Sequence, residues 1–265
     1  MIPLPETWFG KTPSAEWYYL AAADAKFFRL FARGLAVSAH QTGTPIHIHA
    51  INPDIIALGI ADFCNSSFPT VSMTWCEDPI PATLEAGVGQ ARMAYYSNFR
   101  VHMWPHMLRR SGTKRVAVID IDSIFNRPCD LMQYPEPIGI YRRDTQDMPK
   151  ELMCCTSMFW ADASQIDYAE AVLDFMNTRG LYWQGDQEAV YWTAKGMGLL
   201  DTACDISKLG ALLDWEFVEK GTLWTGKGKR KGRDNAFTRR VQELTFQFEA
   251  LRSSESPSKQ LERHL

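Results

Sequence analysis

An apolar strand that runs directly into two aspartates constrains the fold more than any other stretch of this sequence. Residues 116–119 carry no polar side chain, and Asp120, Ile121 and Asp122 follow at once. A strand without polar residues is typical of a sheet whose two faces are both covered by helices. The sequence therefore predicts an α/β fold in which this strand lies near the centre of the sheet.

Other strands and amphipathic helices surround this strand in the sequence. An apolar strand ends on Asp24, a helix follows as far as a C-cap at Gly43, and residues 45–54 alternate apolar side chains with His47 and His49. This strand–helix–strand order implies a parallel pair joined by a crossover. Further strands are predicted over 70–78, 116–122, 137–143 and 152–162, and helices over 91–110 (broken or kinked at Pro105), 164–180, 186–198 and 235–251.

The length of 265 residues suits one large α/β domain. We find no internal repeat and no clear linker, so one domain over 1–252 is the simplest organisation. The polar segment 253–265 is expected to be a disordered tail.

The composition limits which binding partners and which cellular location we expect. The net charge of -3 gives no global basic field, so no nucleic acid is expected as a partner. The six cysteines form no CxxC pair and no zinc spacing, which favours reduced thiols. The N-terminus lacks a signal-peptide pattern, and no stretch of about 18 apolar residues occurs. A cytoplasmic location is the expectation.

Asp120 and Asp122 are two residues apart, so in a strand their side chains would project from one face. Neighbouring carboxylates repel, and each raises the pKa of the other. A divalent cation removes that conflict, and oxygen ligands suit Mg²⁺ or Mn²⁺. The alternative is a solvated turn in which one aspartate caps the backbone.

The residues around this pair resemble a known family. Residues 92–132 are similar to the core of the GT-A glycosyltransferases, especially those of glycosyltransferase family 8. Residues 17–28 resemble the first strand of these enzymes, and 181–192 resemble their Asp-Gln element. Residues 224–232 resemble their late Gly-x-x-Lys loop. The four motifs occur in the family's order, from about residue 17 to 233.

The resemblance implies a single GT-A (Rossmann-like) domain with a mixed, mostly parallel sheet flanked by helices. It implies a hexosyltransferase-like enzyme that transfers sugar from a nucleoside-diphosphate sugar, most plausibly a UDP-sugar, to an unknown acceptor with retention of configuration. The implied site residues are Asp120 and Asp122 for Mn²⁺ or Mg²⁺, Asp186 and Gln187 for catalysis beside the donor sugar, Ala22, Ala23 and Asp24 at the base, and Arg100, Lys227 and Lys229 at the diphosphate.

The sequence also departs from the family pattern. A histidine just before the Gly-x-x-Lys loop usually supplies a third metal ligand, but Leu223, Trp224 and Thr225 stand there. The family's Asn-Ser/Ala-Gly element corresponds loosely to residues 155–157, and Lys26 replaces an asparagine. The third protein ligand of the metal is therefore not identified.

Simpler interpretations remain open for several of these residues. Asp186 starts a helix and would serve there as a first-turn acid, and Arg100 would serve as a surface arginine. His47 and His49 are expected to be core or surface residues rather than zinc ligands, and the pair at 102 and 106 is expected to be structural.

Two other functional classes compete with the enzyme. One is a nucleotide-sugar binding protein without turnover, which the missing histidine suggests. The other is an interaction module in which the basic loop 227–233 binds an anionic polymer or makes a peripheral membrane contact.

Overall fold

A computed structural model describes residues 7–77, 90–143, 147–180, 182–210, 212–218, 221–226, 228 and 234–254. Within these residues an eight-stranded sheet has the order β1-β4-β3-β2-β5-β8-β7-β9. Its strands are β1 (Phe9–Gly10), β2 (Trp17–Asp24), β3 (Ile46–Ile51), β4 (Val71–Cys76), β5 (Arg115–Ile119), β7 (Ile138–Arg142), β8 (Cys154–Asp162) and β9 (Cys204–Asp205). The sheet is the mixed, mostly parallel sheet that the sequence predicts: β2, β3, β4 and β5 are parallel, and β8 runs against them.

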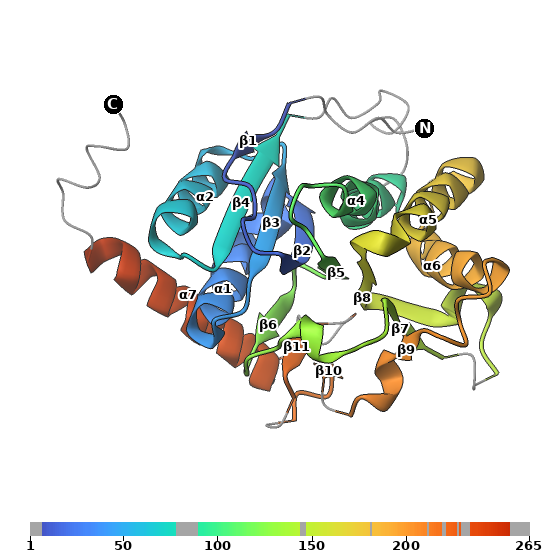
Figure 1. The fold of residues 1–265 in the computed structure, drawn as a ribbon. Coiled ribbons are helices and arrows are strands. Elements are labelled where there is room, and N and C mark those ends of the chain that lie inside the picture. The colour runs from blue at the N-terminus through green and yellow to red at the C-terminus, as the bar shows by residue number, and fades with distance from the viewer. Residues whose placement is uncertain are drawn as a thin grey trace.

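A three-stranded sheet lies below strands β2 and β5 of the main sheet in Figure 1 and has the order β10-β11-β6. It consists of β6 (Ser123–Phe125), β10 (Leu213–Asp214) and β11 (Leu223–Thr225). Because β6 directly follows the Asp-Ile-Asp segment, this small sheet fixes the position of that segment against the residues before the basic loop.

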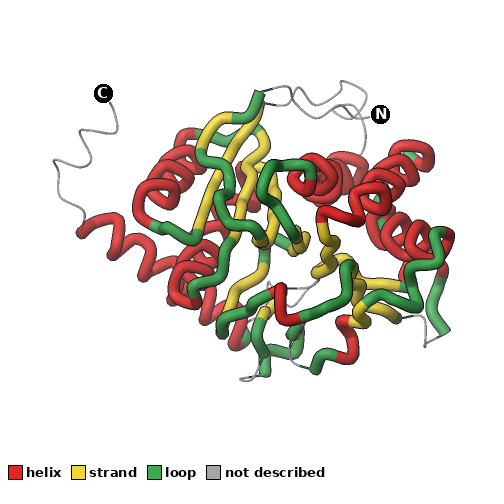
Figure 2. Tube along the Cα trace, in the orientation of Figure 1, coloured by secondary structure: helices red, strands yellow, loops and turns green. Residues whose placement is uncertain are grey.

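Helices cover both faces of the main sheet (Figures 1 and 2). The helices α1 (Ala25–Thr42), α2 (Ile55–Ser67) and α7 (Ala236–Ser254) lie on one side, and α4 (Gln90–Leu108), α5 (Ile166–Arg179) and α6 (Gly185–Gly196) lie on the other. Short 3-10 turns occupy Leu131–Gln133, Lys150–Leu152, Ala163–Gln165 and Ile206–Lys208. This architecture is consistent with a GT-A type domain.

The first strand and helix form for reasons that are visible in the sequence. Six consecutive residues of β2 are buried, and the strand ends at Asp24. Oδ1 of Asp24 accepts the amide hydrogen of Phe27 at 2.9 Å, which caps α1. Gly43 ends that helix with a φ of 67°, a left-handed conformation that glycine adopts without strain. The predicted helix and its cap are confirmed.

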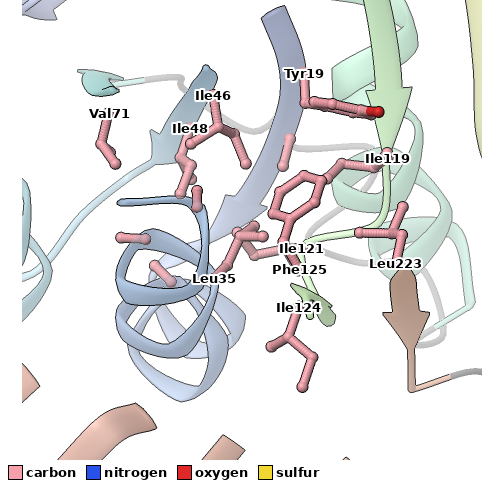
Figure 3. Packing of buried hydrophobic residues seen from close by; sticks show 14 of the residues in the cluster. Tyr19, Leu35, Ile46, Ile48, Val71, Ile119, Ile121, Ile124, Phe125 and Leu223 are labelled. Atoms are coloured by element: carbon pink, nitrogen blue, oxygen red, sulfur yellow. The ribbon is translucent and has the colours of Figure 1, made fainter. Parts of the chain in front are cut away.

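The core has two layers because β2 is covered on both faces. Tyr19, Ala21 and Ala23 pack with α1 and α2, while Leu20 and Ala22 pack on the opposite face with α4. Figure 3 shows the first layer, where the Tyr19 ring lies near Phe125 of the small sheet. This first layer contains residues of both sheets and therefore ties the small sheet to the main one.

Arg115 anchors the beginning of β5. Its guanidinium is buried and pairs with Asp162, and it donates to the carbonyl oxygens of Leu131, Tyr134 and Glu136 at 2.6, 2.7 and 3.0 Å. A buried charge is tolerated only when its donors are satisfied in this way. The anchor fixes the strand that leads into the two aspartates.

Several predicted boundaries were wrong. The strand β5 ends at Ile119, so Asp120 and Asp122 lie in a connection and not on one face of a strand. Likewise β4 ends at Cys76, before Glu77, and residue 78 lies outside the described part of the chain. The helix α4 is not broken at Pro105 but continues to Leu108.

One helix was not predicted, and the C-terminal boundary also differs. The helix α2 follows Asn52-Pro-Asp54, where the sequence indicated only a turn, and Oδ1 of Asp54 caps it by accepting from the amide of Ala57. At the other end of the chain α7 reaches Ser254, so the first two residues of the expected tail are helical. Residues 255–265 lie outside the described part.

Candidate functional site

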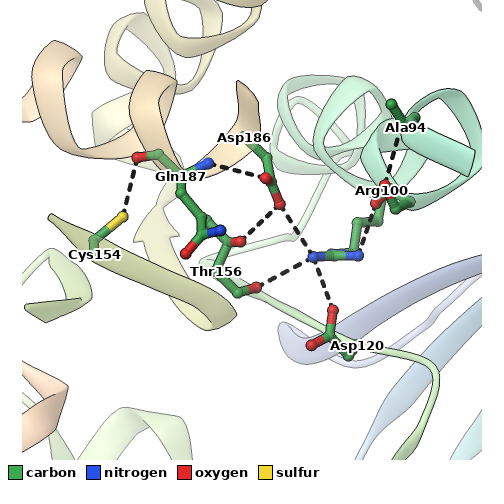
Figure 4. Close-up of polar contacts among 8 residues, drawn as sticks. Ala94, Arg100, Asp120, Cys154, Thr156, Asp186 and Gln187 are labelled. Carbon is green, nitrogen blue, oxygen red and sulfur yellow. Dashed lines mark hydrogen bonds and ion pairs between the residues drawn. The ribbon is translucent and has the colours of Figure 1, made fainter. Parts of the chain in front are cut away.

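Four elements bring polar side chains together where β5 ends (Figure 4). Arg100 comes from α4, Asp120 follows β5, Thr156 lies in β8 and Asp186 stands in the first turn of α6. Ligand sites in open α/β sheets lie at the carboxyl ends of the parallel strands. The sequence predicted three of these four residues as site residues, and the structure brings all three into contact.

Arg100 joins the two acidic residues. Its Nη2 lies 2.8 Å from Oδ1 of Asp120 and 3.3 Å from Oδ2 of Asp186. Nη1 donates to the carbonyl oxygen of Ser97 at 2.7 Å, and Nη2 to that of Thr156 at 3.3 Å. Arg100 is 6% exposed, so the surface-arginine alternative is wrong. Because buried ion pairs are stable only when all partners are present, this arginine holds both carboxylates in place.

An irregularity in β8 aims Thr156 at the site. Tyr141 pairs with Cys155, but the preceding Ile140 pairs with Phe159, so three residues of β8 bulge out between them. Bulges re-aim side chains and are common beside functional sites. The Thr156 hydroxyl donates to Oδ2 of Asp186 at 2.6 Å. Sequence reasoning matched residues 155–157 only loosely, and the polar Thr-Ser pair inside an apolar strand was the available signal.

Asp186 and Gln187 form a compact unit at the start of α6. Oδ1 of Asp186 accepts the amide hydrogen of Gln187 at 2.9 Å, which is part of the helix-start role considered for it. Its other carboxylate oxygen is held by Thr156 and Arg100. The Cys154 thiol donates to the carbonyl oxygen of Gln187 at 3.1 Å. Among the described residues, the buried Oε1 of Gln187 has no hydrogen-bond partner, which leaves an acceptor for a ligand hydroxyl.

Asp122 connects the aspartate pair to the late loop. Its carbonyl oxygen accepts the amide hydrogen of Gly226 at 2.8 Å, and Ser123 pairs with Thr225 across β6 and β11. The hydroxyls of Ser123 and Thr225 are buried and have no partner among the described residues. The start of the Gly-x-x-Lys motif therefore lies against the Asp-Ile-Asp segment.

A metal site at this point would rest on two carboxylates. Among the described residues, no group of three or more His, Cys, Asp or Glu side chains is placed to hold an ion. Mg²⁺ is commonly held by one or two protein carboxylates together with substrate phosphates and water. Asp120 and Asp122 would be the protein ligands of such a site, and Arg100 already pairs with Asp120.

The expected base-binding residues lie at the end of β2. Ala22 and Ala23 are both buried, but their side chains point to opposite faces of the sheet, so they cannot line a ring together. Asp24 stands half-buried at the strand end with one carboxylate oxygen committed to the α1 cap. Its other oxygen remains the atom through which we expect it to contact a base.

Lys227 and Lys229, the lysines expected at the diphosphate, lie outside the described part of the chain, as do Arg230, Lys231 and Arg233. Gly226 immediately before them is buried, and Gly228 between them has a φ of 62°. That left-handed conformation suits glycine alone among ordinary residues without strain.

His47 and His49 are hydrogen-bonded core residues in this fold. His47 lies 2.9 Å from the hydroxyls of both Ser72 and Thr74, and His49 lies 2.8 Å from Thr74 and 3.1 Å from Sγ of Cys76. Burial lowers the pKa of His47 to about 3, so its ring is neutral and serves as a hydrogen-bonding group of the core. Burial also lowers the pKa of His102, to about 4.

Comparisons with known proteins agree with this architecture. No protein-family profile matches the sequence, and no curated protein matches it. Among solved structures, the chain is similar to the apo structure of WbbM, a bifunctional glycosyltransferase, with a TM-score of 0.59 and 11% sequence identity. The similarity covers 89% of this chain and 50% of that one, so this chain spans about half the length of the structure it matches.

That likeness establishes the fold and does not identify family 8. None of the helices in the described residues is long and apolar enough to cross a membrane.

Proposed function

We propose that this protein is a glycosyltransferase that uses a nucleoside-diphosphate sugar, with a UDP-sugar as the first donor to test. The observation that carries the proposal is the buried contact of Arg100 with both Asp120 and Asp186. It joins the residue expected at the diphosphate to the residue expected at the sugar. The likeness of the fold to a glycosyltransferase structure supports the same function.

In the proposed reaction, the bond between the sugar and the diphosphate breaks, the acceptor oxygen bonds to the sugar, and the hydroxyl proton of the acceptor passes to an oxygen of the departing diphosphate. The diphosphate leaves as an anion, so positive charge at its oxygens lowers the barrier. Arg100 is held by Asp120 and by two backbone carbonyl oxygens, and it offers a pre-oriented guanidinium at that place. Lys229 would add charge from the late loop.

Asp186 and Gln187 would orient the donor sugar. A buried carboxylate that is fixed by Thr156 and Arg100 can accept a sugar hydroxyl without reorganising. The free Oε1 of Gln187 offers a second acceptor beside it. The negative charge of Asp186 would also stabilise the cationic character that a sugar gains as its bond to the diphosphate breaks.

Mn²⁺ or Mg²⁺ would be held by Asp120 and Asp122 together with diphosphate oxygens. When bound, it would supply Lewis-acid stabilisation of the leaving group. Retention of configuration remains part of the proposal on the resemblance to family 8 alone.

A nucleotide-sugar binding protein without turnover is the second candidate. It is favoured by the absence of a third acidic, His or Cys ligand near the aspartate pair in the described residues. The basic-loop interaction module remains a third option, since the loop that would mediate it lies outside those residues.

An assay of donor turnover distinguishes the glycosyltransferase from the binding protein without turnover. Release of UDP from UDP-glucose, UDP-galactose and UDP-N-acetylglucosamine should be measured with Mn²⁺, Mg²⁺ and a chelator. The enzyme hypothesis predicts steady UDP release from at least one donor and a loss of at least a hundredfold in Asp186→Asn. Binding of UDP without release from any donor would favour the non-catalytic candidate.

A further inference from the structure

The turn that leads into α6, and so to Asp186 of the proposed sugar site, presents an indole ring to solvent. Trp183 is 53% exposed and stands three residues before Asp186. The chain has nine tryptophans, all within the described residues, and the other eight are buried or half-buried. Single exposed apolar side chains are common on protein surfaces, so what distinguishes this ring is its place three residues before Asp186.

The backbone of this turn is strained and fixed. Gln184 has a φ of 75°, a left-handed conformation that costs energy for a residue with a side chain. The amide of Gly185 donates to the carbonyl oxygen of Tyr182 at 3.1 Å, and the amide of Gln187 donates to that of Gln184 at 3.0 Å. Such conformations persist where the surrounding structure holds them, and they gather at ligand sites.

The residues on either side of Trp183 face the protein. The Tyr182 hydroxyl donates to the Glu188 carboxylate, and its ring lies 3.2 Å from where a Cβ on Gly185 would be. Asp186 is buried against Thr156. Trp183 is therefore the residue of this turn that is held in solvent while its neighbours are anchored.

A pyranose ring suits such an indole. The face of an aromatic ring carries partial negative charge, and the C–H groups on one face of a sugar ring are weakly positive and apolar. The backbone that carries this indole is already held by hydrogen bonds, so a stacking ring does not have to order the turn as well. The donor sugar is expected at Asp186, which is buried, so the solvent side of the turn suits the acceptor.

We propose that Trp183 is the platform on which a sugar ring of a carbohydrate acceptor stacks beside Asp186. This inference rests on the proposed function, because it assigns the second substrate of the same site. It names the acceptor class as a saccharide and leaves the donor residues unchanged.

The test uses an array of immobilised neutral and acidic oligosaccharides, probed with the whole protein in the presence of UDP and Mn²⁺. Wild type should bind a subset of glycans. Trp183→Ala should bind that subset about tenfold more weakly, the factor expected for one aromatic contact, and Trp183→Phe should restore most of the binding. Phe246→Ala is the matched control, since Phe246 is 76% exposed on α7, across the sheet from α6, and its loss should change nothing.

Chemical oxidation of tryptophan gives a second measurement of whether a glycan covers Trp183. N-bromosuccinimide should oxidise Trp183 first, because it is the most exposed tryptophan, and a bound array glycan should protect it. Equal glycan binding by wild type and Trp183→Ala, or a wild type that binds no glycan on the array, would overturn the inference. Failure of wild type to bind UDP would instead count against the proposed function, so the two failures are distinguishable.

Discussion

Nη2 of Arg100 lies 2.8 Å from Oδ1 of Asp120, in a contact where the arginine side chain is 7% exposed and the aspartate side chain 24%. The same nitrogen lies within 3.3 Å of Asp186. The two carboxylates that would flank the donor are thus held by one cation before any ligand arrives. This arrangement makes the geometry of the site depend on Arg100.

Arg100→Met should destabilise the protein by about 2–4 kcal/mol, because two carboxylates would lose their shared buried cation. Asp120→Asn should cost much less stability in the Arg100→Met variant than in the wild type, since in the variant it removes one of the unpaired charges. Urea unfolding of wild type, both single variants and the double variant gives the coupling energy. Strict additivity would show that the contact contributes nothing to stability.

Arg115→Met should be at least as costly, about 3–5 kcal/mol, because it leaves Asp162 and three backbone carbonyl oxygens without their donor. The control is Arg109→Met, whose ion pair with Glu170 is exposed and should contribute under about 1 kcal/mol. Midpoints of urea unfolding compare the two. Equal losses would mean that Arg115 does not anchor β5.

Stability should fall as the pH drops from about 6.5 toward 4. The pKa of His47 is about 3 and that of His102 about 4 in the folded protein, because burial disfavours their charged forms. The unfolded chain binds protons near pH 6.5 while the folded one does not, so protonation favours unfolding. Each histidine contributes a slope of up to about 1.4 kcal/mol per pH unit in this window. An unfolding free energy that is the same at pH 7 and pH 5 would contradict the neutral, buried state of these rings.

Variants of the basic loop distinguish a diphosphate clamp from a general basic patch that binds anions. Lys229→Ala should weaken binding of UDP about tenfold and leave binding of uridine unchanged, because the charge acts on the phosphates. Arg233→Glu, farther along the loop, should weaken UDP binding less, even though it changes the charge by two. Calorimetric titration of both variants with UDP and uridine gives the comparison. Similar small losses in both, with competition by DNA or anionic lipid vesicles, would favour the interaction module.

The base-binding end of β2 gives a matched pair of variants. Ala23→Leu and Ala22→Leu add the same bulk on opposite faces of the strand, and each should cost about 1–3 kcal/mol by overpacking. We expect Ala23→Leu to abolish UDP binding at a temperature where it remains folded. Normal affinity in that variant would place the base elsewhere.

The fold could be predicted from the sequence where local signals were strong. The strand ending at Asp24, the helix ending at Gly43 and the apolar residues 116–119 of β5 follow from burial patterns and caps. The end of β5 could not be predicted, because Ile121 continues the apolar alternation through the connection. The helix α2 was missed because its apolar residues surround the whole helix, and its cap Asp54 is also a common turn residue.

The site was predictable as a set of residues but not as a set of contacts. Asp120, Asp186 and Arg100 each had a motif or a position that marked them. The bond of Arg100 to both acids depends on how α4, β5 and α6 pack, and the aim of Thr156 depends on a bulge that has no sequence signature. Tertiary packing decides both.

Nucleotide binding by thermal shift tests the central claim most directly. At a hundredfold excess over the dissociation constant, a ligand stabilises the folded state by about 2.7 kcal/mol, which corresponds to roughly 5–10 °C for a domain of this size. We predict a shift of this order for wild type with UDP and Mn²⁺, larger than the shift with UDP and a chelator. Asp122→Ala and the milder Asp122→Asn should keep a folded baseline and lose the Mn²⁺-dependent part. Equal shifts in wild type and both variants, or no shift with any nucleoside diphosphate, would contradict the account.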